Sequence, residues 1–189
     1  MLVEKVLKIG FSLVDSGEFE ECITHVNKAI KDFENDPDLH ALRAEAFFKL
    51  NKYEEALKDF NKAARIEPLN PYRYSSRAFL KDAMGDTRGA VDDYKKAYEL
   101  DPNDATILNN MGVLEEKLGY KEAAKKRFDL ADTLYQLDQE NLIIEEDSAS
   151  NSLEKPKDEN YFQILNKIFS NKAYRKEYIQ FLKNGFKLK

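Results

Sequence analysis

The sequence reads PDLHALRAEAFFKLNKYEEALKDFNKAARIEPLN at residues 37–70 and PYRYSSRAFLKDAMGDTRGAVDDYKKAYELDPND at residues 71–104, and these two stretches decide the fold. When the second is aligned with the first, prolines, alanines and aromatic residues coincide at a spacing of 34 residues. The coinciding pairs are Pro37 with Pro71, Ala44 with Ala78, Ala56 with Ala90, Phe60 with Tyr94, Ala63 with Ala97 and Pro68 with Pro102. The chain therefore contains an internal repeat.

The same frame extends to residues 3–36 and 105–138, where small residues stay in register. The eighth, twentieth and twenty-seventh positions of the four units hold Gly10, Ala44, Ala78 and Gly112, then Cys22, Ala56, Ala90 and Ala124, then Ala29, Ala63, Ala97 and Ala131. Small side chains are needed where two helices cross at about 8–10 Å, because larger ones hold the backbones apart. The pattern predicts four pairs of closely packed helices.

The period and this pattern resemble the tetratricopeptide repeat, a helix-turn-helix unit with the signature W-x2-L-G-x2-Y, A-x3-F and a late Pro. The second unit carries His40-x2-Arg43-Ala44-x2-Phe47, then Ala56-x3-Phe60 and Pro68. The resemblance covers the four units, residues 3–138. It implies an all-α fold, a right-handed superhelical α-solenoid of tetratricopeptide-type helix-turn-helix repeats with further helices at the C-terminus.

The hydrophobic pattern divides the chain into three parts. A four-repeat solenoid is expected over residues 1–145, as units 3–36, 37–70, 71–104 and 105–138 with the last helix extended. Its eight helices are predicted to have ends near residues 3/16, 18/34, 37/50, 53/67, 71/84, 87/100, 105/118 and 121/144. Residues 146–159 are acidic and rich in Ser and Asn, so we expect a flexible linker. Residues 160–189 carry apolar side chains at helical spacing and are expected to form a basic amphipathic helical tail.

Charge is distributed unevenly between these parts. Residues 160–189 contain seven basic residues and one acidic residue, a net charge of +6, whereas the whole chain has a net charge of −5. Residues 1–159 therefore carry a net charge of −11. Opposite charges attract, so the tail is expected to be drawn to the repeats or to another acidic surface.

Composition excludes several classes of protein. No apolar run approaches the roughly 20 residues that a membrane helix needs, and the first helix contains Glu4 and Asp15, unlike a secretory signal. The single cysteine, Cys22, rules out an internal disulfide and fits a reducing compartment, so a cytoplasmic location is expected. The acidic net charge argues against nucleic acid as a partner of the whole chain.

Few residues are arranged for chemistry. His25 and His40 do not have metal-ligand spacing, and no glycine-rich loop could hold a phosphate. Acidic pairs such as Asp92-Asp93 are interpreted as the solvated start of a second helix. Cys22 falls at a packing position and is interpreted as a buried, inert thiol. We therefore expect no enzymatic activity, no cofactor, no metal and no small-molecule substrate.

In solenoids of the tetratricopeptide family the first helix of each unit lines a concave groove. Carrying this arrangement over gives an aromatic and apolar strip with polar side chains beside it, which suits an extended peptide or an amphipathic helix, preferably a basic one. The candidate groove residues are Leu7, Phe11, Glu45, Phe48, Tyr72, Phe79, Asn109 and Val113. The alternative is that these aromatic side chains belong to the core between helices. The expected function is that of a non-enzymatic scaffold that binds a protein or peptide partner.

A second candidate surface lies on the last repeat helix. The twenty-sixth position is lysine in the first three units and Leu130 in the fourth, where a polar cap would be usual. The candidate tail-docking stripe is Leu130, Leu134 and Leu137. We expect the tail to dock on this stripe of its own chain, with a swapped dimer or occupation of its own groove as alternatives. Another function also stays open, in which the tail binds an anionic membrane surface or nucleic acid and the repeats serve as an adaptor.

Overall fold

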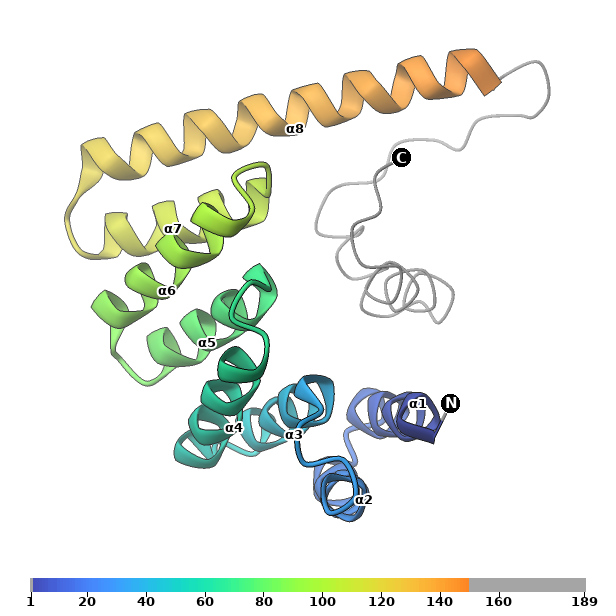
Figure 1. The fold of residues 1–189 in the computed structure, drawn as a ribbon. Coiled ribbons are helices and arrows are strands. Elements are labelled where there is room, and N and C mark those ends of the chain that lie inside the picture. The colour runs from blue at the N-terminus through green and yellow to red at the C-terminus, as the bar shows by residue number, and fades with distance from the viewer. Residues whose placement is uncertain (1, 150–189) are drawn as a thin grey trace. The chain divides into compact units, whose positions relative to one another are not determined.

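The computed structural model describes residues 2–149, with side chains up to Gln136, and every regular element in this range is an α-helix. The helices are α1 (Leu2–Asp15), α2 (Phe19–Ile30), α3 (Pro37–Lys49), α4 (Tyr53–Ile66), α5 (Pro71–Ala83), α6 (Thr87–Leu100), α7 (Ala105–Lys117) and α8 (Lys121–Ala149). Figure 1 shows them in chain order. The predicted all-α repeat solenoid is therefore confirmed. The predicted ends agree with these bounds within a few residues, the largest differences being at α2 and α8.

The chain divides into two compact units, residues 1–146 and 147–189. The four helix pairs belong to the first unit. The predicted linker and basic tail lie outside the described residues, except that residues 146–149 are the end of α8.

The first helices of units two to four begin at a side-chain cap. Asp36, Asn70 and Asp104 have extended backbones and accept hydrogen bonds from amides of the first helical turn. In the first two cases a proline follows, Pro37 or Pro71, whose missing amide hydrogen is not needed at a helix start. The Asp-Pro and Asn-Pro steps of the sequence therefore determine where α3 and α5 begin.

Each pair of helices is joined by a tight turn that requires a left-handed backbone. Gly17, Gly85 and Gly119 occupy this position in units one, three and four, with φ between 80° and 87°. In unit two the same position is Asn51, with φ of 58°. Asparagine tolerates this conformation better than other side chains, so the second turn keeps the geometry of the others without glycine.

The small residues in register lie where helices approach most closely. The alanines at the twentieth and twenty-seventh positions are buried in all four units, as is Cys22. A Cβ atom added to Gly10 would lie 2.5 Å from Cδ2 of Leu42, and one added to Gly112 would lie 2.7 Å from Cε1 of Phe128. Both distances are too short for a real contact, so a larger residue at either crossing would require Leu42 or Phe128 to shift.

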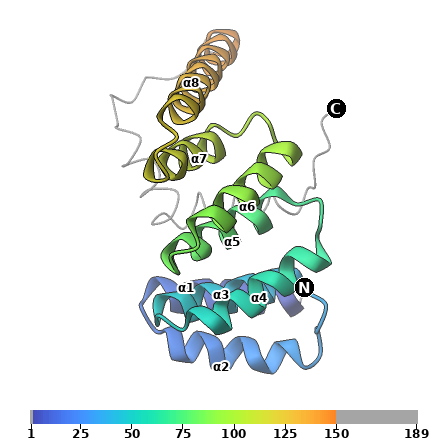
Figure 2. The same ribbon diagram turned by 90° about the vertical axis from the view of Figure 1, so that its left-hand side faces the viewer.

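Packing follows chain order from α1 to α7, and α1 also contacts α3. Figure 2 shows α2 at the bottom, α1, α3 and α4 above it, then α5 and α6, and then α7 with the start of α8 beside it. The first helices of neighbouring units are also joined by ion pairs. Arg73 of α5 pairs with Asp38 of α3, and Lys117 of α7 pairs with Asp82 of α5 at 2.7 Å. The helices α3, α5 and α7 therefore form one continuous face.

None of the described helices is both long and apolar enough to cross a membrane.

Candidate functional site

The candidate groove residues lie on the first helix of each unit, as the repeat frame predicts. Phe79, Val113 and Asn109 are exposed, and 57% of the surface of Phe79 is accessible to solvent. The other five are partly buried: Leu7 and Phe11 on α1, Glu45 and Phe48 on α3, and Tyr72 on α5. The strip is therefore not uniformly exposed. It is most open on α5 and α7.

The structure brings two of the candidate aromatic residues together. The rings of Phe48 on α3 and Phe79 on α5 have centroids 5.4 Å apart and are inclined at 64°, an edge-to-face pair. Tyr53, at the start of α4, is a second ring neighbour of Phe48, with centroids 5.7 Å apart. Phe48 thus contacts two rings and the core, whereas Phe79 is exposed to solvent. Such pairs stabilise by about 0.5–1.5 kcal/mol beyond area burial.

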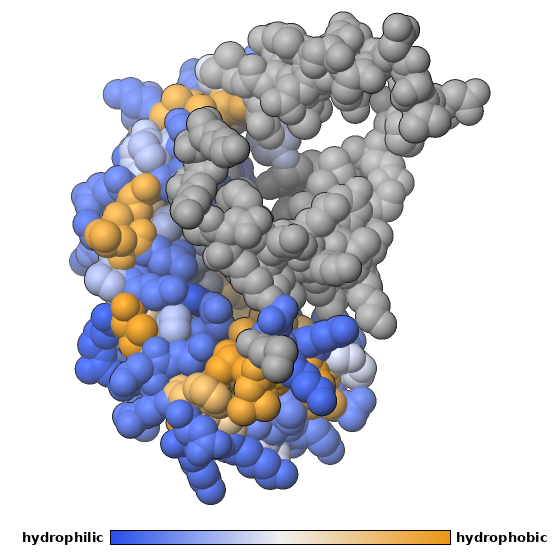
Figure 3. Space-filling view, turned by 45° about the vertical axis from the view of Figure 1, so that its right-hand side comes forward, coloured by the Kyte–Doolittle hydropathy of each residue, from blue (hydrophilic) through white to orange (hydrophobic). Residues whose placement is uncertain are grey.

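Leu7 and Phe11 have a different environment. Both are partly buried against the core cluster formed by α1, α2 and α3. Phe11 contributes to packing there as well as to the surface. Figure 3 shows that the largest apolar area on the face it displays lies in the lower part of the molecule, at the height of α1 to α4 in Figure 1.

Glu45 lies one helical turn before Phe48 on α3, and no hydrogen bond or ion pair joins its carboxylate to another described residue. Burial raises the pKa of Glu45 above its usual value, and the nearby charge of Lys49 opposes this shift. Burial also raises the pKa of the Cys22 thiol to about 11, with a smaller contribution from the charge of Glu45. Among the described residues, Glu45 is therefore a poorly solvated carboxylate without an ion-pair partner.

Two other carboxylates on the first helices are neutralised. Asp38 pairs with Arg73, which also pairs with Glu67. Asp82 accepts hydrogen bonds from Lys117 Nζ and from Thr87 Oγ1, both at 2.7 Å. Burial alone would raise the pKa of Asp82, but these two hydrogen bonds outweigh it and hold the pKa below its usual value.

The candidate tail-docking stripe is only partly described. Leu130 is 37% exposed, and Leu134 is partly buried. The side chain of Leu137 lies outside the described part of the chain. The stripe therefore remains a prediction.

A recurring polar network joins the repeats and was not predicted from the sequence. Arg77 donates to both carboxylate oxygens of Asp93 at 2.7 and 2.8 Å and to Asn61 of the preceding unit at 2.9 Å. Arg43 bonds to Asp59 and Asn27 in the same way, 34 residues earlier. The interpretation of Asp93 as solvated is therefore wrong, because this carboxylate is buried between Arg77 and Lys81. The sequence does contain a pattern that could have predicted this network, because its arginine, aspartate and asparagine recur at fixed positions of the 34-residue frame.

The fourth unit carries a variant of this network. Arg127 stands where the earlier units have Asp59 and Asp93, and it approaches Glu115 at 3.5 Å. Met111 replaces the arginine. Glu115 and Arg127 stand 34 residues after Lys81 and Asp93, so the charges of that pair are exchanged in the fourth unit, and neither Glu115 Oε2 nor Arg127 Nε forms a hydrogen bond within the described residues.

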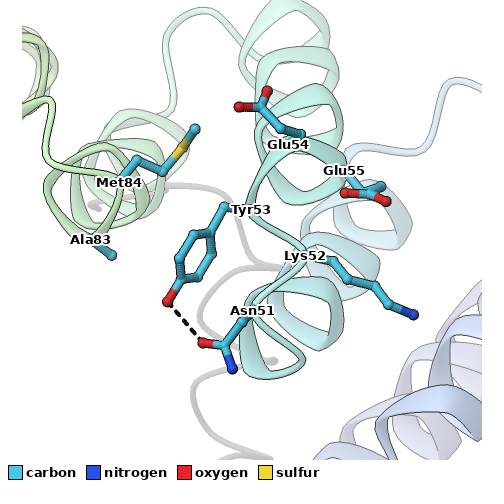
Figure 4. Close-up of a pocket in the computed structure, with 7 residues that line it drawn as sticks. All are labelled: Asn51, Lys52, Tyr53, Glu54, Glu55, Ala83 and Met84. Atoms are coloured by element: carbon cyan, nitrogen blue, oxygen red, sulfur yellow. Dashed lines mark hydrogen bonds between the residues drawn. The ribbon is translucent and has the colours of Figure 1, made fainter.

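Two hollows in the described part of the chain are lined by residues other than the candidate groove residues, although Tyr53, which lines the first, contacts Phe48. Figure 4 shows one of about 450 Å³ between the start of α4 and the end of α5, where Tyr53 donates a hydrogen bond to Asn51 at 2.8 Å. A second, of about 250 Å³, lies on α2. The first is lined by Asn51, Lys52, Tyr53, Glu54, Glu55, Ala83 and Met84, and the second by Glu20, Glu21, Thr24, His25 and Lys28. Within the described residues, no group of three or more His, Cys, Asp or Glu side chains could hold a metal ion.

Comparison with known proteins supports the repeat frame. The tetratricopeptide repeat family matches residues 37–70, which are the second unit, and a second family description, TPR repeat, matches residues 83–119. No curated protein matches the chain.

Solved structures of MamA are similar to this fold. "Crystal structure of MamA" superposes with a TM-score of 0.68 and 20% identity, covering 73% of this chain and 81% of that one. "MamA 41-end from Desulfovibrio magneticus RS-1" gives a TM-score of 0.65 and 18% identity, over 70% of this chain and 75% of that one. At these identities the likeness concerns the fold.

Proposed function

Because the chain is a tetratricopeptide-repeat protein, we propose that it is a non-enzymatic scaffold that binds a peptide or helix of a partner protein on the face formed by its first helices. Cytoplasmic location is part of this proposal and rests on the single buried cysteine. The observation that carries the proposal is the exposed ring of Phe79, seated on Phe48 in the middle of that face.

Exposed aromatic side chains on a rigid support suit a binding surface. Burying apolar area contributes about 25 cal/mol per Å², and aromatic residues dominate the energetics of many interfaces. Phe79 is held by its edge-to-face contact with Phe48 rather than by burial of its own, so a partner can cover most of it. Tyr72, Asn109 and Val113 continue the surface along α5 and α7 with groups that can pack or form hydrogen bonds.

The experiment is capture of partners from a native extract by the full chain and by Phe79→Asp. A partner of the groove should be retained by the wild type and lost with the variant. Leu69→Asp serves as the matched control, because Leu69 is 79% exposed but lies in the loop between α4 and α5. If the same proteins are captured by all three, this face is not the binding surface.

A second candidate function rests on the charge of the tail. Residues 160–189 carry a net charge of +6 against −11 on the rest of the chain. We propose that this segment docks on the stripe of Leu130, Leu134 and Leu137 of its own chain or, in a swapped dimer, of a second copy. Binding to anionic vesicles or nucleic acid is the competing use of the tail.

Removal of residues 160–189 separates these uses of the tail. Docking within the chain predicts a less stable monomer, whereas swapping predicts the loss of a dimer in light scattering. Salt-sensitive binding to anionic vesicles that disappears with the tail would favour the membrane alternative. A truncated chain with unchanged stability, mass and binding would contradict all three.

A further inference from the structure

The chemistry of the partner is indicated by Glu45 and by what surrounds it on the face of the first helices. Glu45 and Phe48 are three residues apart on α3, a spacing that places two side chains on the same side of a helix. Phe48 in turn contacts Phe79 of α5. An unpaired carboxylate and an exposed aromatic ring therefore border the same part of the surface.

As far as the structure describes the chain, Glu45 has no ion-pair partner, which departs from the pattern of Asp38 and Asp82. Asp38 and Asp82 each obtain a cation from the residue 35 positions later, Arg73 or Lys117, on the next first helix. The residue 35 positions after Glu45 is Leu80, which is fully buried and uncharged. The position of α5 that corresponds to Arg73 and Lys117 thus offers Glu45 no cation.

Within the described part of the chain, the cation whose charge acts on Glu45 does not form an ion pair with it. Lys49 is four residues after Glu45 on α3 and is exposed, and its charge lowers the pKa of Glu45 without forming an ion pair. Burial dominates and raises the pKa, so the charged form of Glu45 is left partly desolvated. A carboxylate in this state gains more from an added cation than one that is already paired or fully hydrated.

We propose that the surface recognises a lysine or arginine of the partner peptide, whose cationic group pairs with Glu45 while its aliphatic stem and flanking apolar residues cover Phe79. This inference rests on the proposed function and names the chemistry of its partner. Lysine and arginine combine an apolar stem with a charged end, and both are attracted to the face of an aromatic ring. The pairing of an aromatic ring with an unpaired carboxylate matches that combination.

The test uses a display library of random peptides of about twelve residues, selected on the immobilised full chain. We consider the selected peptides that compete with one another for the wild type and do not bind the Phe79→Ser variant. These peptides should be enriched in a basic residue next to apolar residues. The same selection on Glu45→Gln should lose the basic preference. Glu45→Gln removes the charge with almost no change in shape, and circular dichroism checks that both variants remain helical.

A double-mutant cycle on one selected peptide makes the test quantitative. Replacing its basic residue by methionine should weaken binding to the wild type by about tenfold, but by less than about twofold to Glu45→Gln. Two outcomes would overturn this inference and leave the proposed function standing. The selected Phe79-dependent peptides could show no preference for a basic residue, or the methionine substitution could weaken binding equally to the wild type and to Glu45→Gln. Failure to select any Phe79-dependent peptide would overturn both.

Discussion

The protonation of Glu45 links its environment to the stability of the chain. Burial raises its pKa, so the folded state holds this proton more tightly than the unfolded state does. The free energy of unfolding is therefore highest when pH is below the pKa that Glu45 has in the unfolded state. It falls as pH rises through the higher pKa that Glu45 has in the folded state. Ionisation of Glu45 as pH rises therefore lowers the stability of the fold.

Glu45→Gln should raise the free energy of unfolding at pH 7, because it removes a charge that folding partly desolvates. The gain should shrink as pH is lowered and disappear once Glu45 is protonated in both states. Urea unfolding of both proteins across this pH range measures the difference. A variant that is less stable than the wild type at pH 7 would show that Glu45 has a favourable partner.

Arg77 belongs to a buried network, so its loss should be costly. Arg77→Met leaves the buried carboxylate of Asp93 with Lys81 alone and removes the bond to Asn61. We expect a loss of about 3 kcal/mol in urea unfolding, since removing one partner of a buried pair leaves an uncompensated charge. Arg88→Met, an exposed arginine on α6, is the control and should change stability by less than about 0.5 kcal/mol.

At the scale of the helix, the crossings depend on small side chains. Ala63 is fully buried on α4, and leucine at this position would overpack the crossing. Ala63→Leu should lower the free energy of unfolding by about 1–3 kcal/mol. Lys58→Leu adds a leucine to the exposed side of the same helix and should have little effect. Equal melting curves for Ala63→Leu and the wild type would refute the packing role of the aligned alanines.

Helix positions were predictable because they follow local rules repeated every 34 residues. Asp36-Pro37 and Asn70-Pro71 mark helix starts by capping chemistry, and the glycines of the turns mark helix ends. The tertiary surroundings of single side chains were not predictable in this way. Asp92 and Asp93 are adjacent in the sequence, yet one is exposed and the other is buried, because only Asp93 faces Arg77.

The candidate groove shows the same limit. The repeat frame predicts that Phe48 and Phe79 lie on one face. The exposure of each ring, however, depends on how α3 and α5 pack, because that packing brings the two rings into contact. The lack of an ion pair to Glu45 among the described residues likewise depends on the neighbouring helix. Such features arise from the packing of two repeat units and cannot be predicted from the sequence of either unit alone.

On the scale of the whole repeat array, contacts run mainly between neighbours. The described helices from α1 to α7 each pack on the next, and the arginine networks join adjacent units without reaching further. Stability in such an array is approximately a sum of unit and interface terms. Damage at one end should therefore remain near that end.

This locality can be measured by hydrogen exchange with a pair of matched substitutions. Leu42 on α3 and Leu108 on α7 are both buried, and truncation of a buried leucine to alanine costs about 2–5 kcal/mol. Leu42→Ala should increase amide exchange in α1 to α3 while α6 and α7 stay protected, and Leu108→Ala should produce the reverse pattern. If both substitutions increased exchange equally in all of these helices, the array would unfold as one cooperative block, and the stability of the surface around Glu45 and Phe79 would depend on every repeat.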